Sequence, residues 1–137
     1  MRVCGIEIKG SDSVLVVLEG EAKDFQTIDC DIRKISIENT ENSYDIKNFH
    51  KNFKKFVIDE NIDIVGVKKR NTKGRFAGGA LSFKMEALIQ LLDVKIVVLL
   101  PSATIAKSIK KKNPDYPEDL KKYQHGAFET GFALLQT

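Results

Sequence analysis

Apolar residues along the first forty positions recur at the spacing of β-strands. Residues 2–8 (RVCGIEI) and 13–19 (SVLVVLE) are two β-rich runs, separated by the turn signal KGSD. The two runs are therefore predicted to pair as a hairpin. A third run, residues 27–37, alternates isoleucine and cysteine with charged residues. This alternation predicts a strand with one solvated face, at an edge of a sheet.

From about residue 42 the period of the apolar residues becomes helical. The spacing predicts an amphipathic helix over residues 42–61, with lysines elsewhere on the helix surface. The apolar residues that define its buried face are Ile46, Phe49, Phe53, Phe56 and Val57. The run IDIVGV at 62–67 is apolar on both alternating faces, which is typical of a central strand covered on both sides.

The second half of the chain repeats this change of period. A helix is predicted over residues 81–92, and a buried strand over residues 95–100 (KIVVLL). The segment 101–112 is predicted to form a helix with Ser102 as its cap and lysines in the last turn, where the helix dipole favours them. After a loop with two prolines, residues 120–135 are predicted to form a C-terminal helix.

The predicted order of elements is three strands, helix, strand, helix, strand and two helices. Antiparallel strands that begin with a hairpin, followed by βαβ units, indicate an α/β fold. We expect a mixed five-stranded sheet with helices on both faces. In such sheets, binding sites form where the carboxyl ends of neighbouring strands open into a crevice. With 137 residues and no internal repeat, the chain is expected to be a single domain spanning residues 1–137.

Composition narrows the class of protein. Hydrophobic residues make up 42% and charged residues 30% of the chain, which is typical of a globular protein. The two cysteines, Cys4 and Cys30, lie in strand-like runs rather than at metal-ligand spacing, so buried reduced thiols are expected. The start has no secretory pattern, and no apolar run is long enough to cross a bilayer. The expectation is a cytoplasmic protein without a membrane role.

Charge is concentrated locally rather than overall. The net charge of +3 is too small to identify a nucleic-acid binder. However, the run VGVKKRNTKGRFAGGA at 65–80 leads from a strand into five cations without an acid. A phosphate backbone would suit these cations, with glycines allowing close approach and Phe76 stacking on an unpaired base. The cations are Lys68, Lys69, Arg70, Lys73 and Arg75. The alternative is a solvated surface loop, anchored by Phe76.

Two acidic residues stand out because of their surroundings. Glu7 lies in an apolar strand on the pleat face of Val3 and Gly5, and a carboxylate beside a core needs a cationic partner. The alternative is that Glu7 marks a frayed strand end and faces water. Glu129 and His125 are four residues apart and share one face of the C-terminal helix. That pair is either part of a site or an ordinary surface pairing.

Glycine is unexpectedly frequent in the same helix. Gly126 and Gly131 each cost a helix about 1 kcal/mol relative to alanine. Close approach of this helix to the sheet would explain both residues.

Several of these motifs together resemble a known group of proteins. The segments are GIEIKGS, VGVKKRNTKGRFAGG, SFKMEALIQLL and KYQHGAFETG, in this order. The chain resembles the ribonuclease-H-like superfamily along essentially its whole length, and within it the RuvC-type Holliday-junction resolvases. More narrowly, it resembles an uncharacterised bacterial domain family of that clan. The resemblance implies a ribonuclease-H-like fold.

The same resemblance implies where site residues lie. In Gly5-Ile6-Glu7, Glu7 takes the place of the first catalytic acid. The second acid's place falls on Lys68, or on Lys69 if the register shifts by one residue. Glu129 occupies the place of the last acid. Its companion acid, three residues earlier, is replaced by Gly126, with His125 adjacent.

This departure favours binding over catalysis. A two-metal nuclease needs three or four hard oxygen ligands to hold its ions, and the chain supplies two glutamates and a lysine. At ~4 Å and an effective dielectric of ~20, a Lys–Glu pair is worth roughly 4 kcal/mol before desolvation. The first hypothesis is therefore a DNA- or RNA-binding domain with a degenerate metal site and no cofactor.

Two alternatives are retained. In the first, the domain is an active Mg²⁺- or Mn²⁺-dependent nuclease that hydrolyses phosphodiester bonds. Glu7 and Glu129 would then bind the metal, and His125 would serve as proton shuttle or ligand. In the second, the domain is a protein-interaction module that assembles through its edge strand at residues 26–37. The sequence carries no signal for an oligomeric state.

Overall fold

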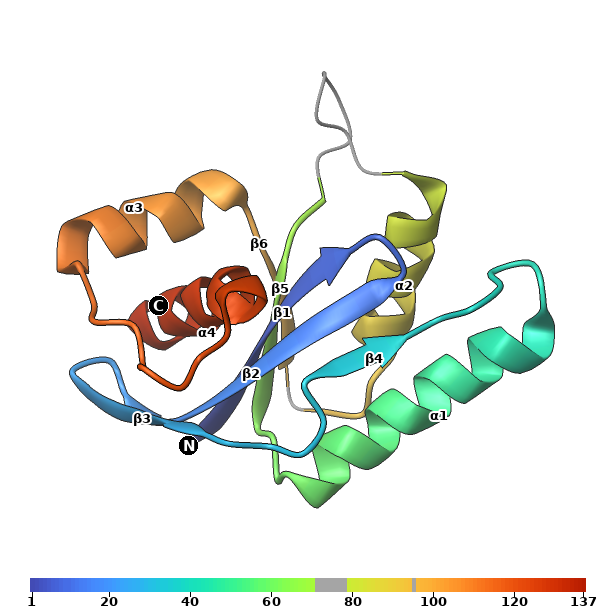
Figure 1. The fold of residues 1–137 in the computed structure, drawn as a ribbon, viewed down its shortest axis with the longest axis horizontal. Coiled ribbons are helices and arrows are strands. Elements are labelled where there is room, and N and C mark those ends of the chain that lie inside the picture. The colour runs from blue at the N-terminus through green and yellow to red at the C-terminus, as the bar shows by residue number, and fades with distance from the viewer. Residues whose placement is uncertain (71–78, 95) are drawn as a thin grey trace.

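The computed structural model describes residues 1–70, 79–94 and 96–137 of the chain. The strands and helices follow one another in the order that the sequence predicts (Figure 1). One additional strand and a short 3₁₀ turn are also present. The strands are β1 (Arg2–Lys9), β2 (Asp12–Glu21), β3 (Asp24–Ile28), β4 (Lys34–Ser36), β5 (Ile64–Lys68) and β6 (Ile96–Leu100). The helices are α1 (Ser43–Asp59), α2 (Ala80–Gln90), α3 (Ser102–Lys112), the 3₁₀ turn η1 (Lys122–Gln124) and α4 (His125–Gln136).

The strands form one mixed sheet in the order β3-β2-β1-β5-β6. β2 runs antiparallel to both β1 and β3, whereas β5 runs parallel to both β1 and β6. The predicted five-stranded α/β sheet is confirmed, and the sixth strand, β4, pairs with β2 outside this path. The carboxyl ends of β1, β5 and β6 therefore meet at one edge of the sheet.

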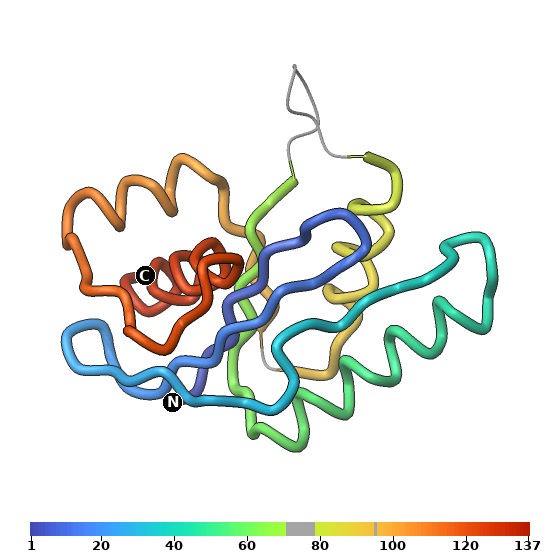
Figure 2. Tube along the Cα trace, in the orientation of Figure 1, coloured from blue at the N-terminus to red at the C-terminus, as the bar shows by residue number. Residues whose placement is uncertain are grey.

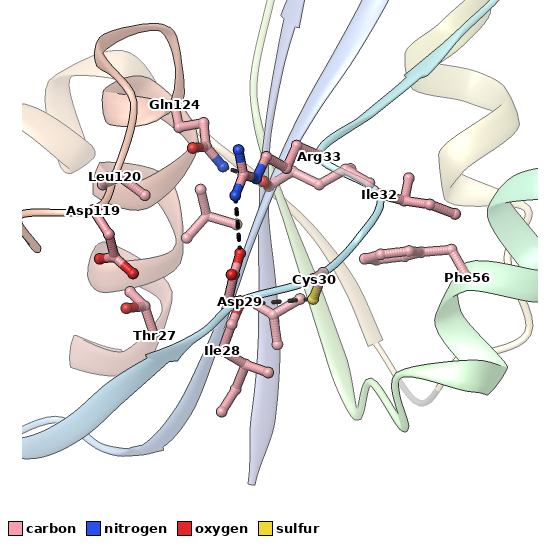
Figure 3. Close-up of a pocket in the computed structure, with 13 residues that line it drawn as sticks. Thr27, Ile28, Asp29, Cys30, Ile32, Arg33, Phe56, Asp119, Leu120 and Gln124 are labelled. Atoms are coloured by element: carbon pink, nitrogen blue, oxygen red, sulfur yellow. Dashed lines mark hydrogen bonds and ion pairs between the residues drawn. The ribbon is translucent and has the colours of Figure 1, made fainter.

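The prediction of a single third strand over residues 27–37 is wrong. β3 pairs with β2 at Val17 to Glu21, and β4 pairs with β2 at Asp12 to Val14. Residues 29–33 cross between them, where the Arg33 guanidinium pairs with Asp29 at 3.1 Å (Figure 3). The side chains around this crossing enclose about 30 Å³, room for about one water molecule. Short, interrupted edges are poor templates for strand addition.

Helices cover both faces of the sheet, as predicted. α1 and α2 lie on one face, and α3 and α4 lie on the other (Figure 1). Side chains of β1 alternate between two cores: Cys4 and Ile6 pack with α1 and α2, whereas Val3 packs with α4. This alternation follows from the two-residue period of a strand. It places Glu7, like Val3 and Gly5, on the face of α4.

α4 packs on β1 with almost no side chain between the two backbones. A Cβ atom on Gly5 would fall within 3.0 Å of the Ala127 carbonyl oxygen and of the backbone of Gly131. Gly131 in turn lies against Gly5 and Leu18. The close approach expected from the helix glycines is present, and it holds the amino end of α4 above the carboxyl end of β1.

The start of α3 differs from the prediction. Ser102 is the first helical residue, the cap position is Pro101, and no side chain caps the helix. Proline fixes the extended backbone that precedes the first turn, so no serine cap forms. The helix ends as expected, with Lys110, Lys111 and Lys112 in the last turn. Within the described residues, no helix has the length and apolarity needed to cross a bilayer.

We predict that Gly5→Ala destabilises the fold by about 3 kcal/mol, the upper end of overpacking costs, because the added methyl group meets backbone atoms that cannot rotate away. Urea unfolding followed by circular dichroism would measure this change. Gly79→Ala is the control, since a Cβ atom there meets no atom within 4 Å, and we expect less than about 1 kcal/mol for it. Equal stabilities for the two variants would contradict the close packing of α4.

Candidate functional site

Glu7 lies against the first turn of α4. Its side chain is only 12% exposed to solvent, although it carries a charged carboxylate group. A Cβ atom on Gly126 would fall within 3.0 Å of both carboxylate oxygens of Glu7. Gly126 therefore provides the space that the Glu7 carboxylate occupies. Glu7 is not the frayed, solvated strand end that was the alternative interpretation.

Lys68 is the lysine that faces Glu7. β1 and β5 are parallel and pair Ile6 with Val67, so the next residue of β5 lies beside Glu7. The Lys68 ammonium is 3.3 Å from Glu7 Oε2 and donates a hydrogen bond to it. Lys69 is exposed, and its backbone N–H donates to the Leu100 carbonyl at 2.8 Å. Since neighbouring side chains of a strand point to opposite faces, this register selects Lys68.

A second ammonium, which the sequence analysis missed, also faces Glu7. Lys9 Nζ is 3.4 Å from Glu7 Oε1 and donates a hydrogen bond to the Tyr123 carbonyl at 3.2 Å. Glu7 Oε1 is buried and accepts no hydrogen bond from the described residues, so Lys9 acts on it through charge. The signal was available: residues two apart in a strand share one face.

Glu129 is held by a residue that the sequence analysis did not identify. The Tyr116 hydroxyl donates a hydrogen bond to Glu129 Oε2. The Tyr116 ring packs on His125, with ring centroids 4.7 Å apart. Partial burial, followed by the bond to the Glu129 carboxylate and its charge, raises the pKa of Tyr116 to about 12.

His125 and Glu129, which share one face of α4, make no hydrogen bond or ion pair with each other in the described part of the chain. Tyr116 contacts both residues instead, its ring against His125 and its hydroxyl on Glu129. Tyr116 comes from the loop between α3 and η1, so the periodicity of α4 gives no indication of this contact. Its role therefore depends on how that loop packs.

Lys68 and Glu129 border one hollow. It has a volume of about 410 Å³ and lies along α3. Its lining residues are Lys68, Ser102, Ile105, Ala106, Ile109, Lys110 and Glu129. Lys68 thus reaches Glu7 with its ammonium and shares a surface hollow with Glu129. Glu7, Lys68, Glu129 and His125 all gather around the amino-terminal half of α4.

The residues after Lys68 that are predicted to contact nucleic acid fall into three groups. Lys69 is exposed. Arg70 is tied to the fold, because its N–H donates to Glu86 at 3.1 Å and its Nη1 donates to the Ile8 carbonyl at 3.0 Å. Lys73, Arg75 and Phe76 lie outside the described residues, and their proposed phosphate and base contacts remain predictions.

The donor set does not fit a pair of divalent ions. Within residues 1–70, 79–94 and 96–137, no group of three or more histidine, cysteine or acidic side chains could hold a metal ion. Glu7 faces two ammonium groups, and Glu129 is bonded to Tyr116. A bridging two-metal site needs several free carboxylates. The free thiols Cys4 and Cys30 lie elsewhere, and burial raises the pKa of both.

The sheet order and the placement of α4 define a RuvC-like α/β fold of the ribonuclease-H-like type. A T. thermophilus RuvC structure in complex with a Holliday junction substrate matches with a TM-score of 0.67 at 10% identity, over 97% of this chain and 91% of that one. The structure titled "Thermus thermophilus RuvC structure" gives a TM-score of 0.68 at 11% identity, over 97% and 92%.

A viral protein shares the fold as well. The Fowlpox virus resolvase in complex with Holliday junction DNA matches with a TM-score of 0.58 at 12% identity, over 99% of this chain and 97% of that one. No curated protein matches the chain in sequence. Residues 1–134 match the family described as "Protein of unknown function (DUF3010)", and the chain belongs to this family. The expected ribonuclease-H-like, RuvC-like fold and the uncharacterised family are both confirmed.

We predict that Lys68 and Glu7 are energetically coupled whereas Lys69 and Glu7 are not. A double-mutant cycle with Glu7→Gln and Lys68→Met should give a coupling energy of about 1–2 kcal/mol, because the pair is partly buried. The same cycle with Lys69→Met should give about zero. Urea unfolding of the four proteins in each cycle supplies the measurement. Coupling to Lys69 instead would show a register shifted by one residue.

We expect the stability of the fold to depend on the ionisation of Tyr116 at high pH. The folded-state pKa of Tyr116 exceeds its ordinary value of 10, so its contribution to stability is complete below about pH 10 and is lost as pH rises toward 12. In an absorbance titration of the three tyrosines, one should ionise last, and Tyr116→Phe should remove that step. The variant should also lose less stability than wild type between pH 10 and 12. If the late step persists in Tyr116→Phe, it belongs to another tyrosine, and the raised pKa of Tyr116 is contradicted.

Proposed function

We propose that this chain is a nucleic-acid-binding domain in which lysine side chains, rather than metal ions, neutralise the Glu7 carboxylate. The observation that carries the proposal is the 3.3 Å contact between the Lys68 ammonium and Glu7. The first acid's position is thereby neutralised from within the chain. The position three residues before Glu129 is Gly126, which contributes no carboxylate.

Positive charge at the same edge of the sheet supports nucleic acid as the ligand. Lys68 and Lys69 end β5, Lys9 ends β1, and the following segment adds Lys73 and Arg75 in sequence. Carboxyl ends of parallel strands are where ligands bind in sheets of this kind. The similar RuvC and Fowlpox virus resolvase structures are complexes with Holliday junctions. If this chain also binds DNA, the phosphates of the DNA would contact these cations.

The geometry favours binding over hydrolysis. A metal ion at Glu7 would have to displace the Lys68 ammonium and tolerate that of Lys9, at 3.3 and 3.4 Å from the two oxygens. A second ion would need Glu129, whose Oε2 already accepts the Tyr116 hydroxyl. The first displacement leaves the Lys68 ammonium without its carboxylate partner, and the second leaves the neutral Tyr116 hydroxyl without its acceptor. Both cost free energy. The roles of Glu7 and Glu129 in this proposal are therefore structural and electrostatic.

We expect Lys69→Ala with Lys73→Ala to weaken binding of labelled single-stranded, duplex and four-way-junction DNA and of RNA. Fluorescence anisotropy would follow affinity against salt concentration. If both lysines contact phosphates, the slope of log K against log salt should shrink by about 1.5, because each phosphate contact releases counterions. Lys47→Ala with Lys51→Ala is the matched control, since these exposed lysines lie on α1, on the opposite face of the sheet.

If none of these nucleic acids binds at low salt, the proposed function is wrong. Cleavage that requires Mg²⁺ or Mn²⁺ and disappears in Glu7→Gln would establish the nuclease instead. An unchanged salt slope in the Lys69/Lys73 variant would mean that the strand end does not contact phosphates.

A further inference from the structure

A second cationic surface lies at the opposite end of α4 from Glu7. Four lysines line a hollow of about 410 Å³ between the β2–β3 turn and the carboxyl end of α3. They are Lys23, Lys107, Lys111 and Lys112. All four are exposed, and none has an ion-pair partner among the described acids. Such unneutralised charges create a local field that attracts anions.

An aromatic hollow adjoins these lysines. It measures about 810 Å³ and is walled by three aromatic rings and two prolines. These residues are Phe25, Tyr116, Phe132, Pro114 and Pro117. Phe25 and Tyr116 are half-buried, so each ring retains accessible surface. Phe25 rests edge-on against Phe132 at 5.7 Å between centroids, which supports its ring from below.

The two hollows form one groove. Both are lined by Ala22, Lys23, Lys112 and Gln136. Gln136 Nε2 donates to the Ala22 carbonyl at 3.1 Å, which joins the end of α4 to the β2–β3 turn. Figures 1 and 2 show that turn beside the ends of α3 and α4. We call this feature the lysine–aromatic groove.

The distribution of charge within the groove is uneven. The lysine end contains no acid among its lining residues, whereas Asp115 and Glu118 border the aromatic end. Phosphates are therefore favoured at the lysine end and repelled from the aromatic end. A planar group with amino hydrogen-bond donors suits the aromatic end, because rings offer stacking and carboxylates accept hydrogen bonds. A nucleotide combines both chemistries in this order.

We infer that the lysine–aromatic groove binds a segment of single-stranded nucleic acid, with phosphates on the lysines and a base against Phe25 and Tyr116. The inference rests on the proposed function for its ligand class, but it concerns a separate site. Gly126 and Gln136 are ten residues apart, which is about 15 Å along α4. A single strand is required because paired bases do not expose a face for stacking.

The lysine half is tested with a labelled deoxycytidine decamer, whose bases carry amino donors, and the variant Lys107→Ala with Lys111→Ala. Both substitutions lie on exposed positions of α3, where alanine favours the helix. The slope of log K against log salt should shrink by about 1.4, since two phosphate contacts are lost from a single strand. Lys47→Ala with Lys51→Ala is again the matched control, because it removes an exposed i,i+4 lysine pair from α1.

The aromatic half is tested by Phe25→Leu. Decamer binding should weaken at least fivefold while the salt slope stays at the wild-type value, because stacking involves no counterion release. Circular dichroism and thermal unfolding check that the variant is folded. As a second measurement, chemical shifts of wild-type protein should change at Phe25 and Tyr116 with the decamer but not with inorganic phosphate. The inference is overturned if Phe25→Leu leaves the affinity unchanged and the decamer does not shift the signals of Phe25 and Tyr116. The groove would then be a general polyanion-binding surface.

The inference about the groove and the proposed function at the strand end can be refuted separately. If the decamer binds and loses affinity in the Lys69/Lys73 variant but not in the Lys107/Lys111 variant, the groove inference is wrong and the proposed function stands. The reverse result supports the groove and removes the strand end as the contact. Binding of duplex or junction without binding of the decamer also overturns the groove inference. Failure of every nucleic acid overturns both.

Discussion

The close approach of α4 to β1 determines where every residue of the candidate site lies. Gly5 lies against the Ala127 carbonyl and the backbone of Gly131, so no side chain separates strand from helix. This packing puts Gly126 directly over the Glu7 carboxylate and Glu129 one turn farther along the helix. A helix held one side chain farther away would leave Glu7 in solvent. Glycine costs helix stability, and the packing of α4 offsets that cost.

The carboxylate that this packing buries needs compensation, and lysines supply it. A divalent ion would add two charges and demand several oxygen ligands in a defined geometry. An ammonium group adds one charge on a flexible side chain and needs fewer oxygen partners. Lys68 and Lys9 each face one oxygen of Glu7. The RuvC-like fold is thus retained in a chain whose described acids do not form a cluster for metal ions.

Positive charge is arranged at both ends of α4. At the amino end, Lys9 and Lys68 face Glu7, and in the sequence β5 is followed by a run of cations. At the carboxyl end, the lysines of α3 and of the β2–β3 turn adjoin aromatic rings. Tyr116 connects the two regions, because its hydroxyl holds Glu129 while its ring borders the groove. The loop between α3 and α4 therefore shapes both surfaces.

Local periods of two and 3.6 residues were enough to predict the fold class, the order of the elements apart from the split between β3 and β4, and the faces that these elements bury. Glu7, Glu129 and the glycines of α4 were also identifiable, since each violates its local pattern. The break between β3 and β4 was not, because isoleucine alternates with polar residues on both sides of it. Three features required the tertiary structure. They are the selection of Lys68 rather than Lys69, the contact of the Lys9 ammonium with Glu7, and the bond from Tyr116 to Glu129. These contacts depend on the register of β5 and on the packing of a loop, and local sequence patterns do not encode distances between segments far apart in the chain.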